Sequence, residues 1–282
     1  MILTPHCDIL ITFTKKHLRQ YYTSAVSGHL FELFDYYLHL RNFCKCKMWI
    51  PEDFDKPKLL SLLKSRYSAE FNEDDLIAGY DYKLIKAPII LCVDNCYHFI
   101  KEHRKSYLCD KFFTFACGDA YFETGAEPPN IITLADSAVY DFSKFNCEVI
   151  EYAKKVNPQI KKSPGTKPFA HITKNCKSIS SNLLSELLLK YPDIIIYSDY
   201  LPQNDNIIRE PIFDFSFGKF VYTPIQRHFD CSNRLITECA LLGIGVDYFC
   251  IDYIDRGLEP RKNNPLGYVL QNDDLIYGIL TK

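Results

Sequence analysis

Short apolar runs alternate with longer amphipathic stretches along the whole chain. Residues 8–14 (DILITFT) have the length of a strand, and residues 24–41 place apolar side chains at helical spacing. Residues 88–93 (PIILCV) form a continuous apolar run, as expected of a parallel strand buried on both faces. Further strands are predicted at residues 47–51, 111–116 and 130–134, and further helices at residues 59–67 and 97–106.

The same alternation starts again after a segment rich in helix and strand breakers. Residues 161–168 (KKSPGTKP) contain two prolines, one glycine and three lysines, and are the best candidate for a linker. Beyond it, strands are predicted at residues 169–173, 193–197, 220–223 and 246–251, and helices at residues 181–191 and 233–242. The pattern therefore predicts two α/β domains with parallel sheets, residues 1–163 and 168–282.

Composition narrows the class of protein only a little. The net charge is −2, so a large basic excess for nucleic acid is absent. The aromatic share is 15%, which suits a polar ligand cleft but is explained as well by an A/T-rich genome. The 12 cysteines form no paired CxxC motif, so we expect free thiols and no metal site. No signal peptide and no membrane-spanning run are recognised, which favours a cytoplasmic protein without a membrane partner.

Polar residues that directly follow strands are the candidates for a site, because ligands of parallel sheets bind beyond the carboxyl ends of the strands. Residues 227–238 lead from a predicted strand into a predicted helix. Asp230 or Ser232 would cap that helix and leave its first amides for a phosphate. Arg234 would neutralise a diphosphate, and Glu238, one turn later, would accept both hydroxyls of a ribose. Arg227 and Asn233 belong to the same loop.

The spacing of this segment resembles a known signature. Asp230-x7-Glu238, followed by Gly243 and Val246, is similar to the donor site of GT-B glycosyltransferases. The resemblance implies two Rossmann-like domains facing each other across a cleft, a nucleotide-diphosphate sugar (a UDP-sugar first) as donor, and no metal. It also implies that Glu238 holds the ribose and that Asp230 faces the transferred sugar. The family more often has Glu at the first position, so the shorter Asp230 is a departure.

An ordinary structural explanation competes with this one. Arg234 and Glu238 lie four residues apart, as in the exposed ion pairs that are common on helices and contribute little. The addition of Arg227, Asp230 and Gly243 in a strand–helix–strand context favours the donor site.

Two other loops could contribute to the donor side. Residues 173–178 follow the first strand of the second half and carry Lys174, Asn175 and Lys177, which would face the diphosphate or form a solvated turn. Residues 252–261, with Asp252, Asp255, Arg256, Gly257 and Arg261, would complete the cleft or form a charged surface loop.

The acceptor side rests on the first half of the chain. Gly28 and His29 lie near the start of the first long helix, without the GxGxxG of dinucleotide-binding enzymes. Asp94 directly follows the run PIILCV, where a general base of an inverting enzyme would be placed. Phage DNA β-glucosyltransferases, which the chain resembles in layout, have their base after an equivalent strand. Asp119 and Asp136 are the reserves; each of these aspartates could instead cap a helix, and the stereochemistry stays open.

The acceptor itself stays open. One that fits the layout is a hydroxymethylated pyrimidine in phage DNA, which would place the protein in the host cytoplasm. Basic stretches that could border such DNA are Lys15, Lys16, His17 and Arg19; Lys101, His103, Arg104 and Lys105; Lys154 and Lys155; and Lys161 and Lys162. Saccharides, lipid-linked sugars and small molecules compete as acceptors. An epimerase and a non-catalytic module that binds sugar nucleotides or nucleic acid compete as functions, and a P-loop kinase is excluded by the missing motif.

Overall fold

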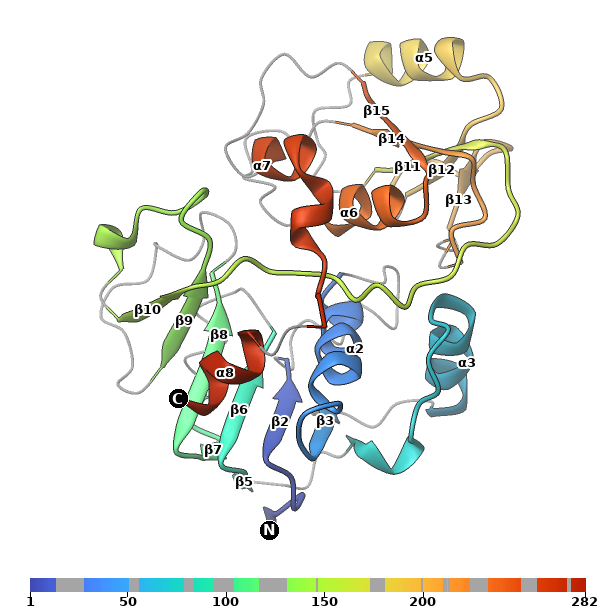
Figure 1. The fold of residues 1–282 in the computed structure, drawn as a ribbon. Helices are drawn as coiled ribbons and strands as arrows, with labels where there is room; N and C mark the ends of the chain where they lie inside the picture. Colours follow the sequence, from blue (N-terminus) through green and yellow to red (C-terminus); the bar gives the residue numbers. More distant parts are fainter. Residues whose placement is uncertain are drawn as a thin grey trace. The chain divides into compact units, whose positions relative to one another are not determined.

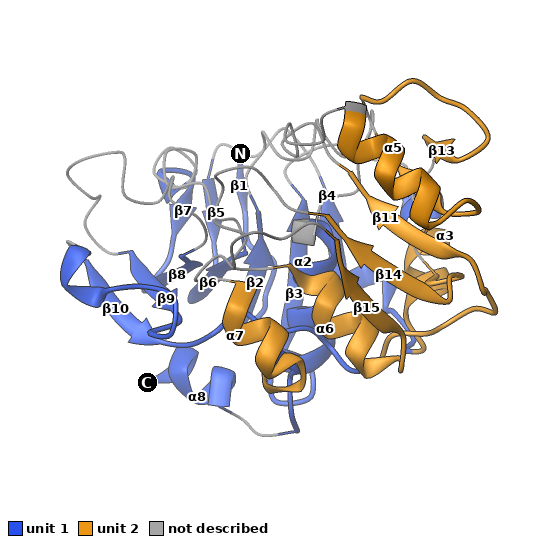
Figure 2. Cartoon of the chain, turned by 90° about the horizontal axis from the view of Figure 1, so that it is seen from above, with its two compact units in different colours: residues 1–59, 69–158, 268–282 blue, residues 60–68, 159–267 orange. Residues whose placement is uncertain are grey.

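The computed structural model describes residues 1–13, 28–50, 56–78, 84–93, 104–116, 131–145, 147–172, 181–198, 200–209, 212, 214–223, 233–249, 258–272 and 275–282. The chain forms two compact units (Figure 2). Unit 1 consists of Met1–Leu59, Ala69–Pro158 and Tyr268–Lys282, and unit 2 of Leu60–Ser68 and Gln159–Gly267. Both units are mixed α/β structures with parallel sheets, as the alternating pattern predicted.

Unit 1 contains a seven-stranded sheet in the order β10-β9-β8-β6-β2-β3-β4, with every neighbouring pair parallel (Figure 1). Its strands are β2 (Ile9–Thr12), β3 (Cys46–Ile50), β4 (Leu76–Ala78), β6 (Ile89–Cys92), β8 (Lys111–Phe115), β9 (Ile132–Ala135) and β10 (Glu148–Glu151). The chain winds outward from β2 on one side and from β6 on the other, which is the doubly wound, Rossmann-like order. The order therefore reverses between β2 and β6.

The helices of unit 1 complete its core. In the described part of the chain they are α2 (Gly28–Leu40) and α8 (Leu275–Thr281), with the short 3-10 turns η1 (Glu73–Asp75) and η3 (Phe142–Lys144). All residues from Leu30 to Leu40 are buried, including Glu32 and Asp35. A helix was predicted at residues 24–41, and α2 confirms it; because α2 is buried from Leu30 onward, its polar side chains need partners inside the protein.

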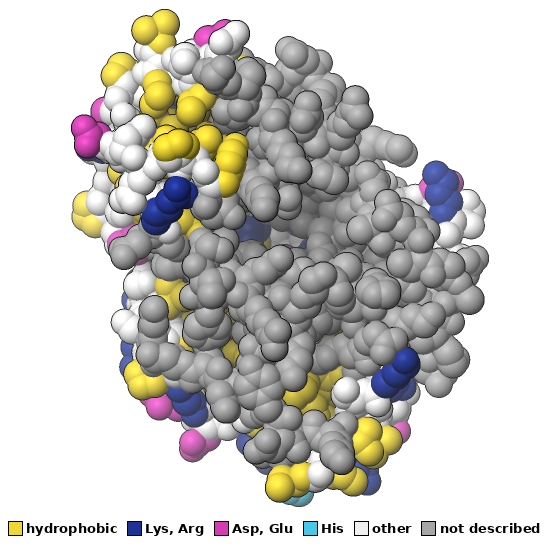
Figure 3. All heavy atoms as spheres, turned by 180° about the vertical axis from the view of Figure 1, so that it is seen from behind, with side chains coloured by type: hydrophobic (Ala, Val, Ile, Leu, Met, Phe, Trp, Pro, Cys, Tyr) yellow, Lys and Arg dark blue, Asp and Glu magenta, His cyan; other side chains and the backbone are white. Residues whose placement is uncertain are grey.

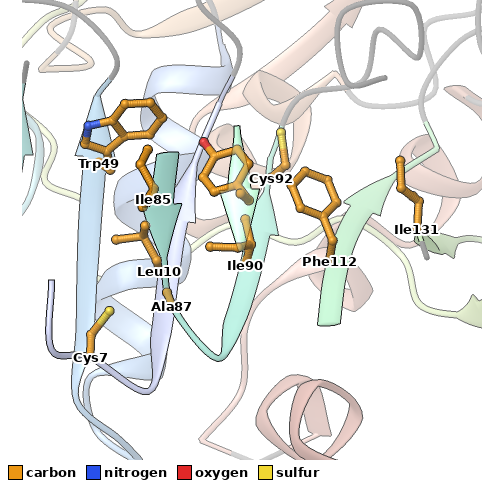
Figure 4. Close-up of a cluster of buried hydrophobic side chains, with 10 residues drawn as sticks. Cys7, Leu10, Trp49, Ile85, Ala87, Ile90, Cys92, Phe112 and Ile131 are labelled. Carbon is orange, nitrogen blue, oxygen red and sulfur yellow. The ribbon is translucent and has the colours of Figure 1, made fainter. Parts of the chain in front are cut away.

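Unit 1 also contains a three-stranded sheet, whose strands occur in the same order as the central strands of the large sheet. Its strands β1 (Ile2–Leu3), β5 (Leu84–Lys86) and β7 (Tyr107–Leu108) pair in that order and directly precede β2, β6 and β8. At the start of β7 the Tyr107 hydroxyl donates to Thr12 at the end of β2 (3.2 Å), so the short strands run back along the large sheet. Buried side chains such as Ile85, Leu10 and Ile90 fill the space between the two sheets (Figure 4). Strands of two or three residues are too short to be recognised from periodicity, and none of the three was predicted.

Unit 2 contains a five-stranded parallel sheet in the order β13-β12-β11-β14-β15. Its strands are β11 (Pro168–His171), β12 (Ile195–Tyr197), β13 (Ile207–Ile208), β14 (Lys219–Tyr222) and β15 (Gly245–Tyr248). Its described helices include α5 (Ser181–Lys190), α6 (Arg234–Leu241) and α7 (Leu258–Asn263), and η4 (Pro265–Tyr268) crosses from unit 2 into unit 1. This order too is doubly wound, and it reverses between β11 and β14. Helix α3 (Lys56–Arg66) begins in unit 1 and contributes its last seven residues to unit 2.

The segment predicted as a linker is irregular up to Lys167, but it is packed rather than extended through solvent. The Ser163 amide donates to the Asp214 carbonyl (2.8 Å), and the Gly218 amide donates to the Lys167 carbonyl (3.0 Å). A side chain at Gly165 would lie 2.1 Å from the backbone of Ser216. The two units divide at Pro158 instead, and unit 1 takes back the last fifteen residues, Tyr268–Lys282.

Most predicted elements lie within three residues of the observed ones. One observed strand is shorter than predicted: residues 246–251 were expected to form it, and β15 ends at Tyr248. The predicted helix 97–106 falls mostly outside the described residues. The described cysteines form no disulfide. Nowhere in the described part of the chain is a helix both long and apolar enough to cross a membrane.

Candidate functional site

Both predicted donor loops follow the two strands at the reversal point of unit 2, β11 and β14. Strands β11 and β14 are parallel neighbours, with Phe169 opposite Phe220. The predicted loop 173–178 follows β11, and the predicted loop 227–232 follows β14, so both leave the same edge of the sheet. The loop side chains Lys174, Asn175, Lys177, Arg227, Asp230 and Ser232 lie outside the described residues.

Helix α6 has a different N-terminus from the one predicted. Its N-cap residue is Asn233, whose side chain makes no capping hydrogen bond, so neither Asp230 nor Ser232 occupies the cap. The helix ends where the sequence predicted, at Gly243, which has a positive φ of 65°. The Ile244 amide donates to the Cys239 carbonyl (2.8 Å) and the Gly243 amide to the Ala240 carbonyl (3.3 Å), which together form a Schellman motif.

Glu238 lies on α6 at the centre of a buried ion cluster. Its Oε1 accepts from the Nε of Arg234 (2.8 Å) and lies 2.7 Å from the Nη2 of the same residue. The same oxygen accepts from Arg66 at the end of α3. The carboxylate is wholly buried and the two arginines nearly so. The pair of Arg234 and Glu238 therefore exists, but it is not the exposed surface pair considered from the sequence.

The two arginines decide the charge of Glu238. Burial favours the neutral acid, but the guanidinium groups of Arg234 and Arg66 outweigh it and hold the pKa of Glu238 below its ordinary value. The carboxylate is thus ionised at neutral pH. Its second oxygen, Oε2, is buried and has no hydrogen-bond partner in the described structure. A buried anionic oxygen without a donor is costly, and a ligand hydroxyl would satisfy it.

A second buried polar atom without a described partner, a neutral hydroxyl, stands at the end of β14. Thr223 directly follows the strand, is 4% exposed, and its Oγ1 has no hydrogen-bond partner in the part of the chain that the structure describes. Thr223 precedes the segment that leads from β14 to α6, and Glu238 lies one turn into that helix. Sequence reasoning missed Thr223, because a threonine at a strand end carries no distinguishing pattern.

Two more residues of the cluster were not foreseen in their observed roles. Arg66 stacks over the ring of Phe215 (4.7 Å from the guanidinium carbon to the ring centre), and no motif marks it in the sequence. Arg261 belongs to the charged segment 252–261, yet it is buried on α7 and its Nη1 donates to the Thr237 hydroxyl (3.1 Å). For Arg261 the expectation of a surface loop is therefore wrong; Asp252, Asp255, Arg256 and Gly257 lie outside the described residues.

Two of the acceptor-side candidates belong to segments that follow the central strands β2 and β6 of unit 1. Asp94 follows β6 after Val93, and Gly28 begins α2, which connects β2 to β3. Asp94, Asp119 and the side chain of His29 lie outside the described residues. The reserve base Asp136 is engaged: its Oδ1 accepts from the Ala138 amide (2.9 Å) and its Oδ2 from the Tyr268 hydroxyl (3.1 Å).

Lys154 has a different role from the predicted exposed basic residue. It is buried, and its ammonium lies 2.7 Å from Glu32 of α2 and donates to the Val93 carbonyl (3.0 Å). The same ammonium stands 5.2 Å from the ring centre of Phe115. Lys154 therefore ties α2 to the end of β6, directly before Asp94.

The remaining basic candidates are dispersed where they can be described. Lys161 donates to the Lys64 carbonyl (2.5 Å), the Lys155 ammonium lies over the Tyr152 ring (5.6 Å), and Lys105 and Lys162 are exposed. On the face drawn in Figure 3, the described Lys and Arg side chains occur singly and form no continuous patch. Lys15, Lys16, His17, Arg19, Lys101 and His103 lie outside the described residues.

Comparison with family models, curated proteins and solved structures finds no match to this chain. Among the residues that can be described, no group of three or more His, Cys, Asp or Glu side chains is arranged to hold a metal ion. The fold and the ion cluster of unit 2 are thus the basis for a functional proposal.

Proposed function

We propose that the protein is a glycosyltransferase of GT-B type that moves a sugar from a nucleotide-diphosphate sugar to a hydroxyl acceptor. Two doubly wound parallel sheets support the proposal, since each provides a ligand edge at its reversal point. The observation that carries it is the Oε2 atom of Glu238, an ionised, buried oxygen on α6 that has no hydrogen-bond partner in the described part of the chain.

In this proposal Glu238 accepts a hydrogen bond from a ribose hydroxyl through Oε2. Arg66 and Arg234 hold Oε1, which fixes the orientation of the carboxylate and keeps it charged. Because the carboxylate is wholly buried, the groups that cover Oε2 must move aside before a ribose reaches it. Positively charged side chains of the two donor loops, Lys174, Lys177 and Arg227, would receive the diphosphate.

On the acceptor side, Asp94 would remove the proton of the attacking hydroxyl in an inverting reaction, with Asp230 near the transferred sugar. A UDP-sugar is the proposed donor and a hydroxymethylated pyrimidine of DNA one proposed acceptor. A saccharide or lipid-linked acceptor is the alternative.

In the proposal the buried Thr223 hydroxyl, at the end of β14, also binds the donor. The test uses Thr223 rather than Glu238, because Thr223→Val removes a hydroxyl without uncovering a buried charge. Thermal unfolding is followed with a panel of nucleotide sugars, since a donor that binds the folded state raises the midpoint. We expect stabilisation of the wild type by one class of donor, and an affinity lower by about tenfold in Thr223→Val, equivalent to one lost hydrogen bond. Thr133→Val, a buried threonine of β9 in unit 1, is the matched control and should bind as the wild type does.

The absence of stabilisation by every nucleotide sugar would refute the proposal. Product analysis then separates the remaining classes. Consumption of the donor only when a hydroxyl acceptor is present indicates a transferase, conversion of the donor alone indicates an epimerase, and binding without consumption indicates a non-catalytic module.

A further inference from the structure

A cavity lies in unit 1 at the amino edge of the large sheet, away from the edge where the proposed substrates bind. The chain passes from the short sheet to the large one three times, between β1 and β2, between β5 and β6, and between β7 and β8. Because these strands are neighbours in both sheets, the three turns lie next to each other. They border an open cavity of about 630 Å³, a volume typical of small-molecule sites.

The polar lining of this cavity is predominantly basic. Lys86, Arg104 and His6 contribute cationic or titratable side chains, against the one carboxylate of Asp110 in the described lining. Ala87, Pro88 and Leu108 provide an apolar wall, and Leu108 is 46% exposed although it is a large aliphatic residue. A cationic side and an apolar side in one cavity match a small organic anion.

Arg104 is held in place and retains a hydrogen-bond donor. Its Nη1 donates to the Tyr107 carbonyl (2.9 Å), and its guanidinium lies 5.4 Å from the ring centre of Phe112. Its Nε is buried and has no hydrogen-bond partner within the described structure. A carboxylate or phosphate oxygen would supply the missing acceptor with a charge-assisted hydrogen bond.

The first turn is strained where it borders the cavity. His6 has a φ of 51°, a left-handed conformation that costs a residue with a side chain about 1–2 kcal/mol. Such conformations persist when the surrounding structure imposes them, and they cluster at ligand sites. The cavity is therefore marked by two independent features, the strained backbone of His6 and the unpaired Nε of Arg104.

We propose that this cavity binds a small organic anion, whose carboxylate or phosphate group is held by Arg104 and Lys86 and whose apolar body lies against Ala87, Pro88 and Leu108. The site is separate from the proposed donor and acceptor sites, since its lining residues come before β2, β6 and β8 of the seven-stranded sheet, whereas the proposed substrates lie beyond the ends of the sheet strands. A metabolite bound here would stabilise unit 1 without taking part in the transfer.

The chain provides its own reporter of binding. Trp49 is the only tryptophan, and its ring makes an edge contact with Tyr107 (5.8 Å between centres), which lines the cavity. Phenyl phosphate and benzoate are titrated as anionic probes and benzyl alcohol as the neutral probe, with the full chain and Trp49 fluorescence as readout. We expect saturable binding of at least one anion with a dissociation constant below about 1 mM, and much weaker binding of benzyl alcohol.

Two variants assign the binding to the proposed residues. Lys86→Gln and Arg104→Gln should each weaken the anion by about tenfold, whereas Lys105→Gln, an exposed neighbour outside the lining, should bind as the wild type does. Lys86 is exposed, so its variant decides the question even where Arg104→Gln fails to fold. No saturable change with either anion, equal binding of benzyl alcohol, or wild-type affinity in Lys86→Gln would each overturn the proposal.

Discussion

At the scale of the residue, the ion cluster of Glu238 combines one contact within its own helix and one with a residue far away in the sequence. Arg234 is four residues away on the same helix, and this contact follows from helix geometry. Arg66 is 172 residues away and reaches the same oxygen only through the tertiary fold. The two arginines together compensate the burial of the carboxylate, and both contact Oε1.

The lowered pKa of Glu238 makes the stability of the protein depend on pH. A carboxyl group with a lower pKa in the folded than in the unfolded state stabilises above its unfolded pKa, about 4.5, and this stabilisation disappears as the pH falls through the folded value. We expect Glu238→Gln to lower the free energy of unfolding by about 3–5 kcal/mol at neutral pH, because the arginines lose a buried partner. The difference from the wild type should shrink below pH ~4.5.

Urea unfolding at a series of pH values measures this difference. Glu186→Gln, which removes an exposed carboxylate of α5, controls for the loss of one charge. A constant difference between the wild type and Glu238→Gln across the acid range would contradict the ionised cluster.

At the scale of the element, close backbone packing explains the breaker-rich segment before β11. The sequence predicted an irregular segment from its prolines and glycine, and the structure has one. The glycine, however, is required by contact with the chain at Ser216 and Phe217, not by the flexibility of a linker. Glycine serves both purposes, so the sequence alone does not distinguish them.

Alanine substitutions test whether close packing requires Gly165, with Gly278 of α8 as a glycine that has open space around it. The new methyl group of Gly165→Ala would lie 2.1 Å from the Ser216 backbone, so we expect a loss of about 1–3 kcal/mol from overpacking. Gly278→Ala in α8 meets nothing within 4 Å and should stabilise the helix by about 0.5–1 kcal/mol. Chemical denaturation of both variants measures the two changes, and an unchanged stability in Gly165→Ala would show that the segment is loosely packed.

At the scale of the whole molecule, each unit is assembled from segments that are distant in sequence. The end of the chain, with α8, returns to unit 1, where Tyr277 stacks on Phe43 (5.6 Å between ring centres). The bridge between Val156 and Val269 joins the same parts of the chain. A division of the sequence into two consecutive halves does not describe these units.

Leucine-to-alanine variants of α8 test which unit the helix stabilises. Leu280 is wholly buried, so Leu280→Ala should cost about 2–5 kcal/mol, whereas Leu275→Ala, at a position 49% exposed on the same helix, should cost less than about 0.5 kcal/mol. Hydrogen exchange locates the effect. We expect faster exchange in β2 and β6 of unit 1, and faster exchange confined to β11 and β14 would assign α8 to unit 2 instead.

The sequence by itself determined the class of fold and most of its elements. The run PIILCV predicted a buried strand from its continuous apolar residues, and Gly243 predicted the end of α6 from the conformational preference of glycine. Both signals are local, because they depend only on residues that are neighbours in the sequence. The same reasoning located the strand ends, and with them the loops of the proposed donor site.

Only the tertiary structure decided which side chains meet and which are buried. The joining of Arg66 to Glu238, the burial of Lys154 against Glu32, and the cavity beneath the three turns depend on contacts between segments far apart in the chain. Local sequence preference carries no information on such contacts, because burial and pairing are set by how the sheets and helices pack.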